Sequence, residues 1–419
     1  MNVFLNELKQ RGLVAQLTNE EKITNQLNSG AKLYCGFDPT ADSLHVGSLL
    51  PLITLLRFKK AGHTIMPLIG GATGMIGDPS FKAQERTLND ESTVTVFKTA
   101  IISQIQSILG NDVVVVDNND WTANMNVIEF LRDVGKHFSV NAMINRDSVK
   151  SRLEREDQGI SFTEFSYQLL QSMDFWHLFK NEGCSMQLGG SDQWGNITTG
   201  IDLIHKREGN EAIATGLTIP LVTKSDGTKF GKTESGAVWL SAEKTSPFNF
   251  FQFWLKTTDN DIEKLFKMFS FKSVEEINEV LAADKERTKP MAQQLLAEEM
   301  TLIVHGQEAL DAVLRMNNAL FDNNFDKLEE NDFLLLEKDG MPSVSTSEIN
   351  LLELLVIAGL AKSKREARDF VKAGAVFING VRNMAREFDE INNLNVSDFK
   401  FSKFSILQRG KRNFVLIKK

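Results

Sequence analysis

The sequence predicts an α/β protein in which a parallel sheet is followed by a helical region and a small α+β module. Residues 33–37 and 64–69 are apolar runs that each lead into a loop of glycine and turn residues, as buried strands of a parallel sheet do. After Ser246 helical periodicity dominates, at 260–269, 274–283, 291–305 and 308–321, and after Asn350 a mixed pattern returns. A chain of 419 residues has room for two or three such domains.

Charge is distributed unevenly along the chain. The whole sequence carries a formal net charge of −8, but residues 351–419 hold 14 lysines and arginines against 7 acidic residues. This segment therefore contributes +7, which leaves −15 for the other 350 residues. An acidic body joined to a basic module is the asymmetry expected when one module contacts nucleic-acid phosphates.

The cysteine and histidine content argues against a disulfide framework and against a structural metal site. The chain has two cysteines, Cys35 and Cys184, and six histidines that are scattered without a ligand-like pair. No apolar run approaches the roughly 18 residues of a membrane helix, and the first residues lack the apolar segment of a signal peptide. We therefore expect a cytoplasmic protein without a protein-bound structural metal.

The stretch YCGFDPTADSLHVGSLL, which begins at Tyr34, predicts a strand, a tight loop and the start of a helix. Its first residues suit a buried strand, its middle is rich in turn and N-cap residues, and its end begins an apolar helix that reaches Phe58. The loop delivers Thr40, His45 and Gly47 to a helix N-terminus at the end of a strand. Such a position favours phosphate and is where open parallel sheets bind ligands.

Several further strands are expected between this stretch and the helical region. The run 64–69 leads into GGATGMIGDPSFKAQER, whose glycines allow the backbone to pass close to a ligand. The spacing of those glycines fits neither the dinucleotide fingerprint nor the Walker phosphate loop. The β-branched run 113–116 precedes DNNDW, residues 125–133 are expected to be helical, and 217–222 is expected to be a strand.

The helix expected at 163–178 carries a polar stripe on a largely apolar background. Spacings of three, four and three residues place four polar side chains on one face of it: Glu164, Tyr167, Gln171 and Asp174. A polar stripe on a buried helix is either solvated or faces a polar ligand. Tyr34 and Tyr167 are the only two tyrosines, against 29 phenylalanines, so both hydroxyl groups lie in candidate functional segments.

Two later segments also carry features of a nucleotide site. In QLGGSDQWGN, a strand and a turn lead to a helix N-terminus, where Gly189 and Gly190 permit close approach to a ligand. Asp192 in this turn either binds a ribose hydroxyl or simply caps the helix. The loop LVTKSDGTKFGKTES then presents Lys229 and Lys232, three residues apart, as charged tips.

These segments together resemble the signatures of class I aminoacyl-tRNA synthetases. GFDPTADSLHVGSLL resembles the His-x-Gly-His element in the form found in bacterial tyrosyl-tRNA synthetases, and KFGKT resembles the Lys-Met-Ser-Lys-Ser loop. GGSDQWGN lies between them, FTEFSYQLLQ resembles the tyrosine-binding helix of that family, and the similarity covers nearly the whole chain. The second histidine of the first signature is Ser48 here. Because serine is shorter, we expect either a weaker contact with the nucleotide or a contact bridged by water.

The resemblance implies that L-tyrosine is activated by ATP to tyrosyl-AMP and then transferred to the 3′ end of tRNA(Tyr). Catalytic roles are implied for Thr40, His45, Lys82, Arg86, Lys229 and Lys232. Tyrosine binding is implied for Tyr34, Asp78, Tyr167, Gln171, Asp174 and Gln193, with Gln187 nearby. ATP binding is implied for Gly36, Asp38, His45, Gly47, Ser48, Gly190, Asp192 and Lys232. Magnesium is expected to arrive with ATP, bound mainly by phosphates and water.

The resemblance also implies the domain organisation and the partners. A Rossmann-like catalytic domain is expected at 1–220, followed by a catalytic lysine loop with its connection at 221–246. A helical anticodon-binding domain is expected at 247–321 and a linker at 322–349. The last part, at 350–419, is expected to be an RNA-binding domain that resembles one of a ribosomal small-subunit protein. In that last domain tRNA phosphates are expected to contact Lys364, Arg365, Arg368 and Lys372. FLRDVGKHFSVN, at 130–141, resembles the dimer interface of the family, so a homodimer is expected.

Three alternatives differ in what they require of these residues. A tryptophanyl-tRNA synthetase has the same fold, but it is opposed by the set of Tyr34, Tyr167, Gln171 and Asp174. A paralogue that only binds RNA is supported by Ser48 alone, and it is opposed by the intact Lys229, Lys232, His45 and Thr40. An unrelated nucleotidyltransferase would not need the basic C-terminal module.

Overall fold

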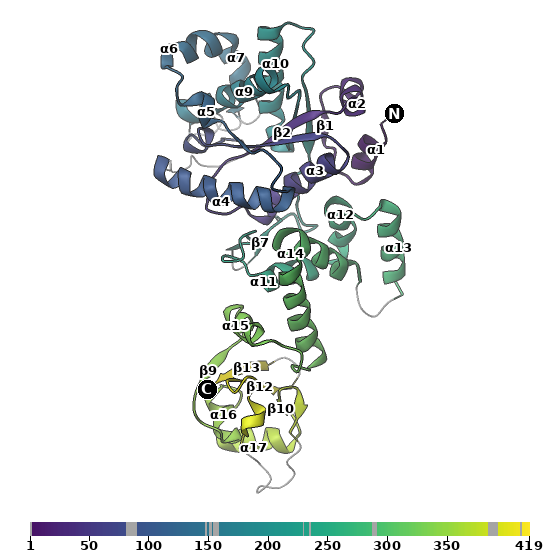
Figure 1. Ribbon diagram of the computed structural model, residues 1–419, viewed down its shortest axis with the longest axis vertical. Coiled ribbons are helices and arrows are strands. Elements are labelled where there is room, and N and C mark those ends of the chain that lie inside the picture. The colour runs from purple at the N-terminus through teal and green to yellow at the C-terminus, as the bar shows by residue number, and fades with distance from the viewer. Residues whose placement is uncertain are drawn as a thin grey trace. The chain divides into compact units, whose positions relative to one another are not determined.

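The computed structural model describes residues 2–80, 90–146, 149–150, 153, 159–228, 230–233, 236–286, 291–383, 393–410 and 413–419 (Figure 1). The chain forms two compact units. One comprises Met1–Thr245 with Phe253–Val304, and the other comprises Ser246–Gln252 with His305–Lys419. None of the described helices combines the length and the apolar character that crossing a membrane requires.

A six-stranded sheet forms the centre of the first unit. Its order is β1 (Gln16–Leu17), β6 (Thr215–Ile219), β5 (Met186–Gly190), β2 (Lys32–Phe37), β3 (Thr64–Ile69) and β4 (Val116–Asp117). All neighbours are parallel except β1, which runs antiparallel to β6. The residues of β6 are all buried, as in a sheet covered on both faces. The carboxyl ends of the parallel strands therefore lie at one edge, where ligands bind in open sheets.

The helices of this unit follow from local sequence signals. They are α1 (Val3–Gln10), α2 (Glu20–Asn28), α3 (Leu49–Lys60), α4 (Glu91–Leu109), α5 (Asn119–Thr122), α6 (Val127–Glu129), α7 (Val140–Ile144), α9 (Phe162–Glu182), α10 (Trp194–Glu208), α12 (Asp259–Phe269) and α13 (Val274–Asp284). The long α9 begins where the Ser161 side chain accepts from the Glu164 N–H, and it ends at Gly183, which has a φ of 64°.

Three expected elements differ from the structure. The strand expected at 113–116 starts only at Val116, because only Val116 and Asp117 pair with β3, while Val114 is exposed. The strand expected at 217–222 ends at Ile219, since Pro220 lacks the N–H that a ladder needs. The helix expected at 125–133 is split into α6 and a wider π-helical segment, Phe130–Val134.

Two helices, α11 (Pro247–Leu255) and α14 (Met291–Asp322), contribute residues to both units. The two helices expected at 291–305 and 308–321 form the single element α14, which is interrupted at Gly306. Gly306 has φ 82° and ψ 176°, a conformation that favours glycine, so the interruption lies where the sequence pattern breaks.

The second unit contains a small α+β module. Its sheet has the order β11 (Val381–Arg382), β10 (Val376–Ile378), β12 (Phe404–Arg409), β13 (Asn413–Lys418) and β9 (Ser343–Ser345), with only the β13–β9 pair parallel. The helices α15 (Glu330–Lys338), α16 (Leu351–Ile357) and α17 (Lys364–Lys372) accompany it. Leucines of α16 and residues of β12 and β13 share one core. The predicted α/β fold class, with a helical region and a small α+β module, is confirmed.

The range 322–349, expected to be a linker, contains regular structure. Phe333 of α15 is fully buried and stacks on Phe404 of β12, with ring centroids 5.2 Å apart. An ion pair also ties the same range to the sheet, between Glu337 of α15 and Lys418 of β13 at 2.5 Å. The polar residues that suggested a linker lie on the exposed face of α15. The buried face of this helix is small and includes Phe333 and Leu336, three residues apart.

Candidate active site

The carboxyl ends of neighbouring strands place most of the predicted residues close together. Asp38 follows β2, the glycine loop follows β3, Asn118 follows β4 and Asp192 follows β5. The helix α9 carries the polar stripe, of which Tyr167 and Asp174 are buried.

Asp174 is a buried carboxylate with two donors. It is 2% exposed, and its two oxygens accept from Asn118 Nδ2 at 2.9 Å and from Trp121 Nε1 at 2.8 Å. Burial raises the pKa of this carboxyl to about 7, against the effect of the two donors, which lower it. The group is therefore oriented, and it titrates near neutral pH.

Tyr34 presents a buried hydroxyl beside this carboxylate. Its side chain is 1% exposed, and among the described residues its hydroxyl oxygen has no hydrogen-bond partner. Burial, and then the negative charge of Asp174, raise the Tyr34 pKa well above its usual value. Gln187 pairs with Tyr34 across the sheet, and its Oε1 is likewise buried without such a partner in the described part of the chain. A bound polar ligand would satisfy both atoms, which otherwise cost about 1–3 kcal/mol each.

A second polar cluster lies further toward the start of α9. Gln193 donates to Asp78 Oδ2 at 2.7 Å, and Gln171 donates to Gln193 Oε1 at 3.2 Å. Asn196 donates to Gln171 Oε1 at 3.0 Å, so three residues predicted to bind one ligand are joined in one network. Tyr167 donates to Asp38 Oδ2 at 2.8 Å, and burial raises its pKa well above the usual value.

The two clusters are separated by a distance that suits a small amino acid. Tyr167 and Asp174 are seven residues apart on α9, which is about 10 Å along the helix axis. One end offers acidic and amide acceptors, and the other offers a carboxylate and a hydroxyl. The arrangement can bind a ligand that has a cationic group at one end and a hydroxyl at the other.

Asn118 connects the two clusters, and the sequence analysis gave it no role. It is fully buried, it accepts from the Ala72 N–H at 2.8 Å, and it donates to Thr73 Oγ1 at 3.0 Å as well as to Asp174. Thr73 in turn donates to Asp38 Oδ1 at 2.8 Å. Trp121 was missed as well. The signal that could have found both is their place in the segment that follows a strand, since such segments meet at the ligand-binding edge.

The two signature segments lie next to each other. His45 Nδ1 accepts from the Gly47 N–H at 3.0 Å, and the short helix η1 (Val46–Ser48) then leads into α3. Gly231, with a φ of 84°, packs so tightly against Val46 that a Cβ at this position would clash with the valine side chain. His45 also forms an isolated bridge with Trp239. The lysine loop and the first signature therefore meet at the N-terminus of α3.

Glycines in the first signature and in GGSDQWGN permit close packing around the predicted nucleotide site. A Cβ at Gly47 would come within 2.7 Å of the His45 ring, and one at Gly190 would clash with the Asp192 carboxylate. Gly36 is an exposed residue in the otherwise largely buried β2, and Thr40 is exposed in the loop after it. Each of these glycines leaves main-chain atoms open to close approach.

Several predicted residues are not placed with their side chains. Lys82, Arg86 and Lys229 lie outside the described residues. The backbone of Lys232 belongs to β7 (Lys232–Thr233), which pairs with β8 (Gly236–Ala237). In the second unit, Lys364, Arg365 and Lys372 are exposed on α17, Lys364 pairs with Glu353 at 2.5 Å, and Arg368 is half-buried.

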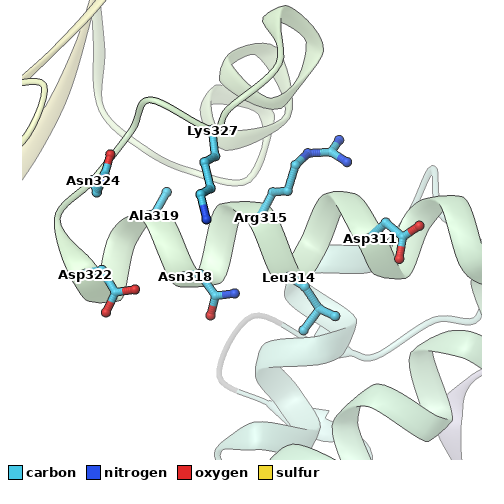
Figure 2. A pocket seen from close by; sticks show the side chains of 8 residues that line it. All are labelled: Asp311, Leu314, Arg315, Asn318, Ala319, Asp322, Asn324 and Lys327. Carbon is cyan, nitrogen blue, oxygen red and sulfur yellow. The ribbon is translucent and has the colours of Figure 1, made fainter.

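The second unit also has a polar hollow of about 520 Å³ along α14 (Figure 2). It is lined by Asp311, Leu314, Arg315, Asn318, Ala319, Asp322, Asn324 and Lys327. Arg315 donates to the buried carboxylate of Asp332 at 3.0 Å. None of the predicted site residues lines this hollow, so it is separate from the candidate active site.

Comparison with known proteins identifies the family. A model described as tRNA synthetases class I (W and Y) matches residues 26–322, and one described as the Tyrosine--tRNA ligase SYY-like C-terminal domain matches 334–417. The Tyrosine--tRNA ligase of Neisseria gonorrhoeae strain NCCP11945 is 53% identical over 99% of both chains, and the Tyrosine--tRNA ligase 1 of Vibrio parahaemolyticus is 50% identical over 99% of both. The crystal structure of a C-terminally truncated mitochondrial tyrosyl-tRNA synthetase from Aspergillus nidulans superimposes with a TM-score of 0.67 at 31% identity, covering 76% of this chain and 94% of that one. The chain therefore belongs to the tyrosine–tRNA ligases, within the class I tRNA synthetases for tryptophan and tyrosine.

Proposed function

We propose that the chain activates L-tyrosine with ATP to tyrosyl-AMP and transfers the tyrosyl group to the 3′ end of tRNA(Tyr), the reaction of its family. One observation carries the assignment of substrate. The Tyr34 hydroxyl is buried without a partner among the described residues, beside a carboxylate that Asn118 and Trp121 orient. A phenolic hydroxyl placed between Tyr34 and Asp174 satisfies both, whereas a phenylalanine ring leaves them unpaired.

The opposite end of the substrate, its ammonium group, is assigned to the second cluster. Asp78 supplies a charge, and Tyr167, Gln171 and Gln193 supply acceptors around it. The network among Gln171, Gln193 and Asn196 supports this role because it fixes the amide groups before the substrate arrives. Asp38 is assigned to ATP in this proposal, and its bond to Tyr167 links the nucleotide side to the tyrosine side.

Adenylate formation requires no protein nucleophile. The substrate carboxylate attacks the α-phosphorus of ATP, a new C–O–P linkage forms, and the bond to pyrophosphate breaks. The barrier is lowered by positioning and by charge at the phosphate oxygens. We assign that charge to Lys82, Arg86, Lys229 and Lys232. Thr40 and His45, whose Nδ1 already accepts from the Gly47 N–H, are assigned to hydrogen bonding. The meeting of the two signature segments at α3 supports the assignment of His45 and Lys232. Magnesium enters with ATP, held mainly by phosphate and water oxygens.

The nucleotide base and ribose are assigned to the edge between the two signatures. Gly36, Gly47, Gly190 and Asp192 line this edge, and Ser48 stands where the family has histidine. The close packing at Gly47 and Gly190 supports a role in which main-chain atoms approach the nucleotide.

Transfer to tRNA requires the second unit. We assign tRNA phosphates to Lys364, Arg365, Arg368 and Lys372 of α17, and the anticodon to the helical region at 247–321. The balance of +7 in residues 351–419 supports contact with a polyanion. We assign the protein to the cytoplasm, and the two buried free cysteines are compatible with a reducing compartment.

The homodimer is proposed through the segment from α6 to α7. Val127 and Ile128 are 71% and 69% exposed, and Leu131 and Val140 add further exposed apolar surface. Contiguous apolar residues of this kind mark interaction surfaces. Light scattering after gel filtration should give a dimer for the wild type and for Val114→Asp, a matched exposed valine elsewhere, but a monomer for Ile128→Asp. A dimer in both variants would contradict this interface.

The proposed function is tested by ATP–pyrophosphate exchange with tyrosine, phenylalanine and tryptophan in parallel. Exchange with tyrosine alone is the expected result, and it also establishes that Ser48 is compatible with activation. Exchange with tryptophan would reassign the substrate. Absence of exchange with all three, alongside intact tRNA binding, would indicate a paralogue that only binds RNA.

A further inference from the structure

The imidazole of His177 stacks on the indole of Trp121. The ring centroids are 4.3 Å apart and the ring planes differ by 13°, so the two rings lie face to face. His177 is three residues after Asp174 on α9, which puts both side chains on the same side of the helix. Asn181 Nδ2 lies 3.2 Å from His177 Nδ1 and holds the imidazole from the next turn of the helix. One helix therefore presents the Asp174 carboxylate and the ring that stacks on its donor.

Trp121 needs such support because of where it is attached. It lies on α5, a helix of four residues whose N-cap residue, Asn118, makes no side-chain capping hydrogen bond. So short a helix has little stability of its own. The indole is half-buried, and it packs against the apolar cluster that contains Tyr34, Phe175 and Leu178. Within the described residues, His177 is the aromatic ring that contacts the indole face to face.

We propose that His177 is a positioning residue for tyrosine recognition, which keeps the Trp121 N–H directed at Asp174 Oδ1. The inference depends on the proposed function, because it concerns the carboxylate that we assign to the substrate hydroxyl. If the indole turned away, Asp174 would lose one of its two donors. A buried carboxylate with fewer donors is less stable as the anion that accepts from the phenol.

The first test compares three variants in the exchange assay. His177→Ala removes the stack, His177→Phe keeps a flat ring, and Lys180→Ala changes an exposed residue of the same helix as the control. We expect His177→Ala to raise the KM for tyrosine about three- to tenfold, the range of an aromatic pair, with kcat and the KM for ATP unchanged. The ratio of kcat/KM for tyrosine to that for phenylalanine should fall by a similar factor. His177→Phe should restore both values to within about twofold of the wild type.

Three results would overturn the inference. The first is an unchanged KM for tyrosine in His177→Ala. The second is a His177→Phe variant as impaired as His177→Ala, because the ring would then not be the cause. The third is an equal rise of the KM for tyrosine and for ATP together with a lower Tm, which would indicate general destabilisation.

Calorimetric titration with tyrosine separates this inference from the proposed function. If the wild-type protein neither exchanges nor binds tyrosine, both fall together. If it binds tyrosine, and the Kd of His177→Ala equals that of the wild type, only the role of His177 is refuted.

Discussion

The two ends of the candidate site are built in different ways. At the hydroxyl end, buried side chains hold one another, and Asp174 accepts from Asn118 and Trp121. At the nucleotide end, the described features are mostly main-chain features, with the N-terminus of α3 and tightly packed glycines at 47 and 231. On the proposed assignments, the substrate is selected by side chains that are oriented before binding, whereas the nucleotide is bound by main-chain positions and by cations.

Asp174→Ala should give the largest difference between the effect on tyrosine use and the effect on ATP binding. It removes the acceptor for the substrate hydroxyl and leaves the Asn118 and Trp121 donors unpaired in a buried site. We expect kcat/KM for tyrosine to fall by about 10³ while the KM for ATP changes little. Tyrosyl-tRNA synthetases are the established example of this kind of selection, with about 10⁵ between tyrosine and phenylalanine, a known magnitude and not a result of this structure.

Steady-state exchange kinetics check this prediction, with Glu182→Ala as an exposed acidic control on the same helix. Unchanged tyrosine affinity in Asp174→Ala would refute the assignment of the hydroxyl end. A parallel loss of ATP affinity would mean that the two ends are not independent.

Lys232→Ala should have the opposite pattern, with a lower kcat and unchanged binding of tyrosine. Removing one positive group that stabilises phosphate charge in the transition state typically lowers kcat by about 10²-fold. Tyrosine binding, measured by calorimetry, should stay unchanged because the hydroxyl end has its partners within α5, α9 and β2. Lys224→Ala, in the same loop, serves as the control. If Lys232→Ala lost tyrosine binding and kept its kcat, the assignment of the lysine loop to the phosphates would be wrong.

The residues proposed for the nucleotide end are easier to recognise as sequence motifs than those around the hydroxyl end, for a physical reason. Phosphate and nucleotide sites use short contiguous loops at helix N-termini, so His45, Gly47 and the lysine loop appear as motifs in the sequence. The α9 stripe was also visible, since its members recur at helical spacing. Asn118 and Trp121 carry no such pattern, because only the pairing of β4 with β3 brings them to Asp174.

The fold shows the same division between local and long-range information. Strand 64–69 and the helices after Ser246 follow from local periodicity, and β3 and α12 to α14 match them closely. The helix and strand within 322–349 could not be predicted from local periodicity. The helix α15 buries only a few residues, and β9 forms through its pairing with β13. Such short elements depend on distant partners that a local pattern does not contain.

The pH dependence of kcat/KM for tyrosine should reflect the titration of Asp174 at the hydroxyl end. Burial raises the Asp174 pKa to about 7 in the free protein, and the anion is the form that accepts from the substrate phenol. Below that pH the carboxyl is protonated, so kcat/KM for tyrosine should rise about tenfold between pH 6 and pH 8 and then level off. The KM for ATP should stay flat, and Asp174→Asn should abolish the transition.

The free energy of unfolding should also depend on the protonation of Asp174, but it should fall with rising pH where tyrosine use rises. Because the folded-state pKa lies above the unfolded value of 3.8, the native state binds the extra proton between these two values. The stability that this group contributes is therefore present at low pH and is lost as the pH rises through about 7. Urea denaturation at pH 5.5, 7 and 8.5 measures this trend, and a free energy of unfolding that increases through pH 7 in the wild type relative to Asp174→Asn would contradict it.

Ser48→His should produce the smallest effect, and only at the nucleotide end. Ser48 is the residue before α3, is half-buried and makes no side-chain cap, so its hydroxyl is not needed to start the helix. A histidine there reaches further, and one added hydrogen bond to the ribose would lower the KM for ATP by about two- to tenfold. The KM for tyrosine should not change, because the donors that orient Asp174 are Asn118 and Trp121, which belong to a different segment. If Ser48→His leaves both the KM for ATP and kcat at their wild-type values in the exchange assay, serine does not weaken the nucleotide contact. If Ser48→His changes the KM for tyrosine, the nucleotide end and the hydroxyl end are not independent of each other.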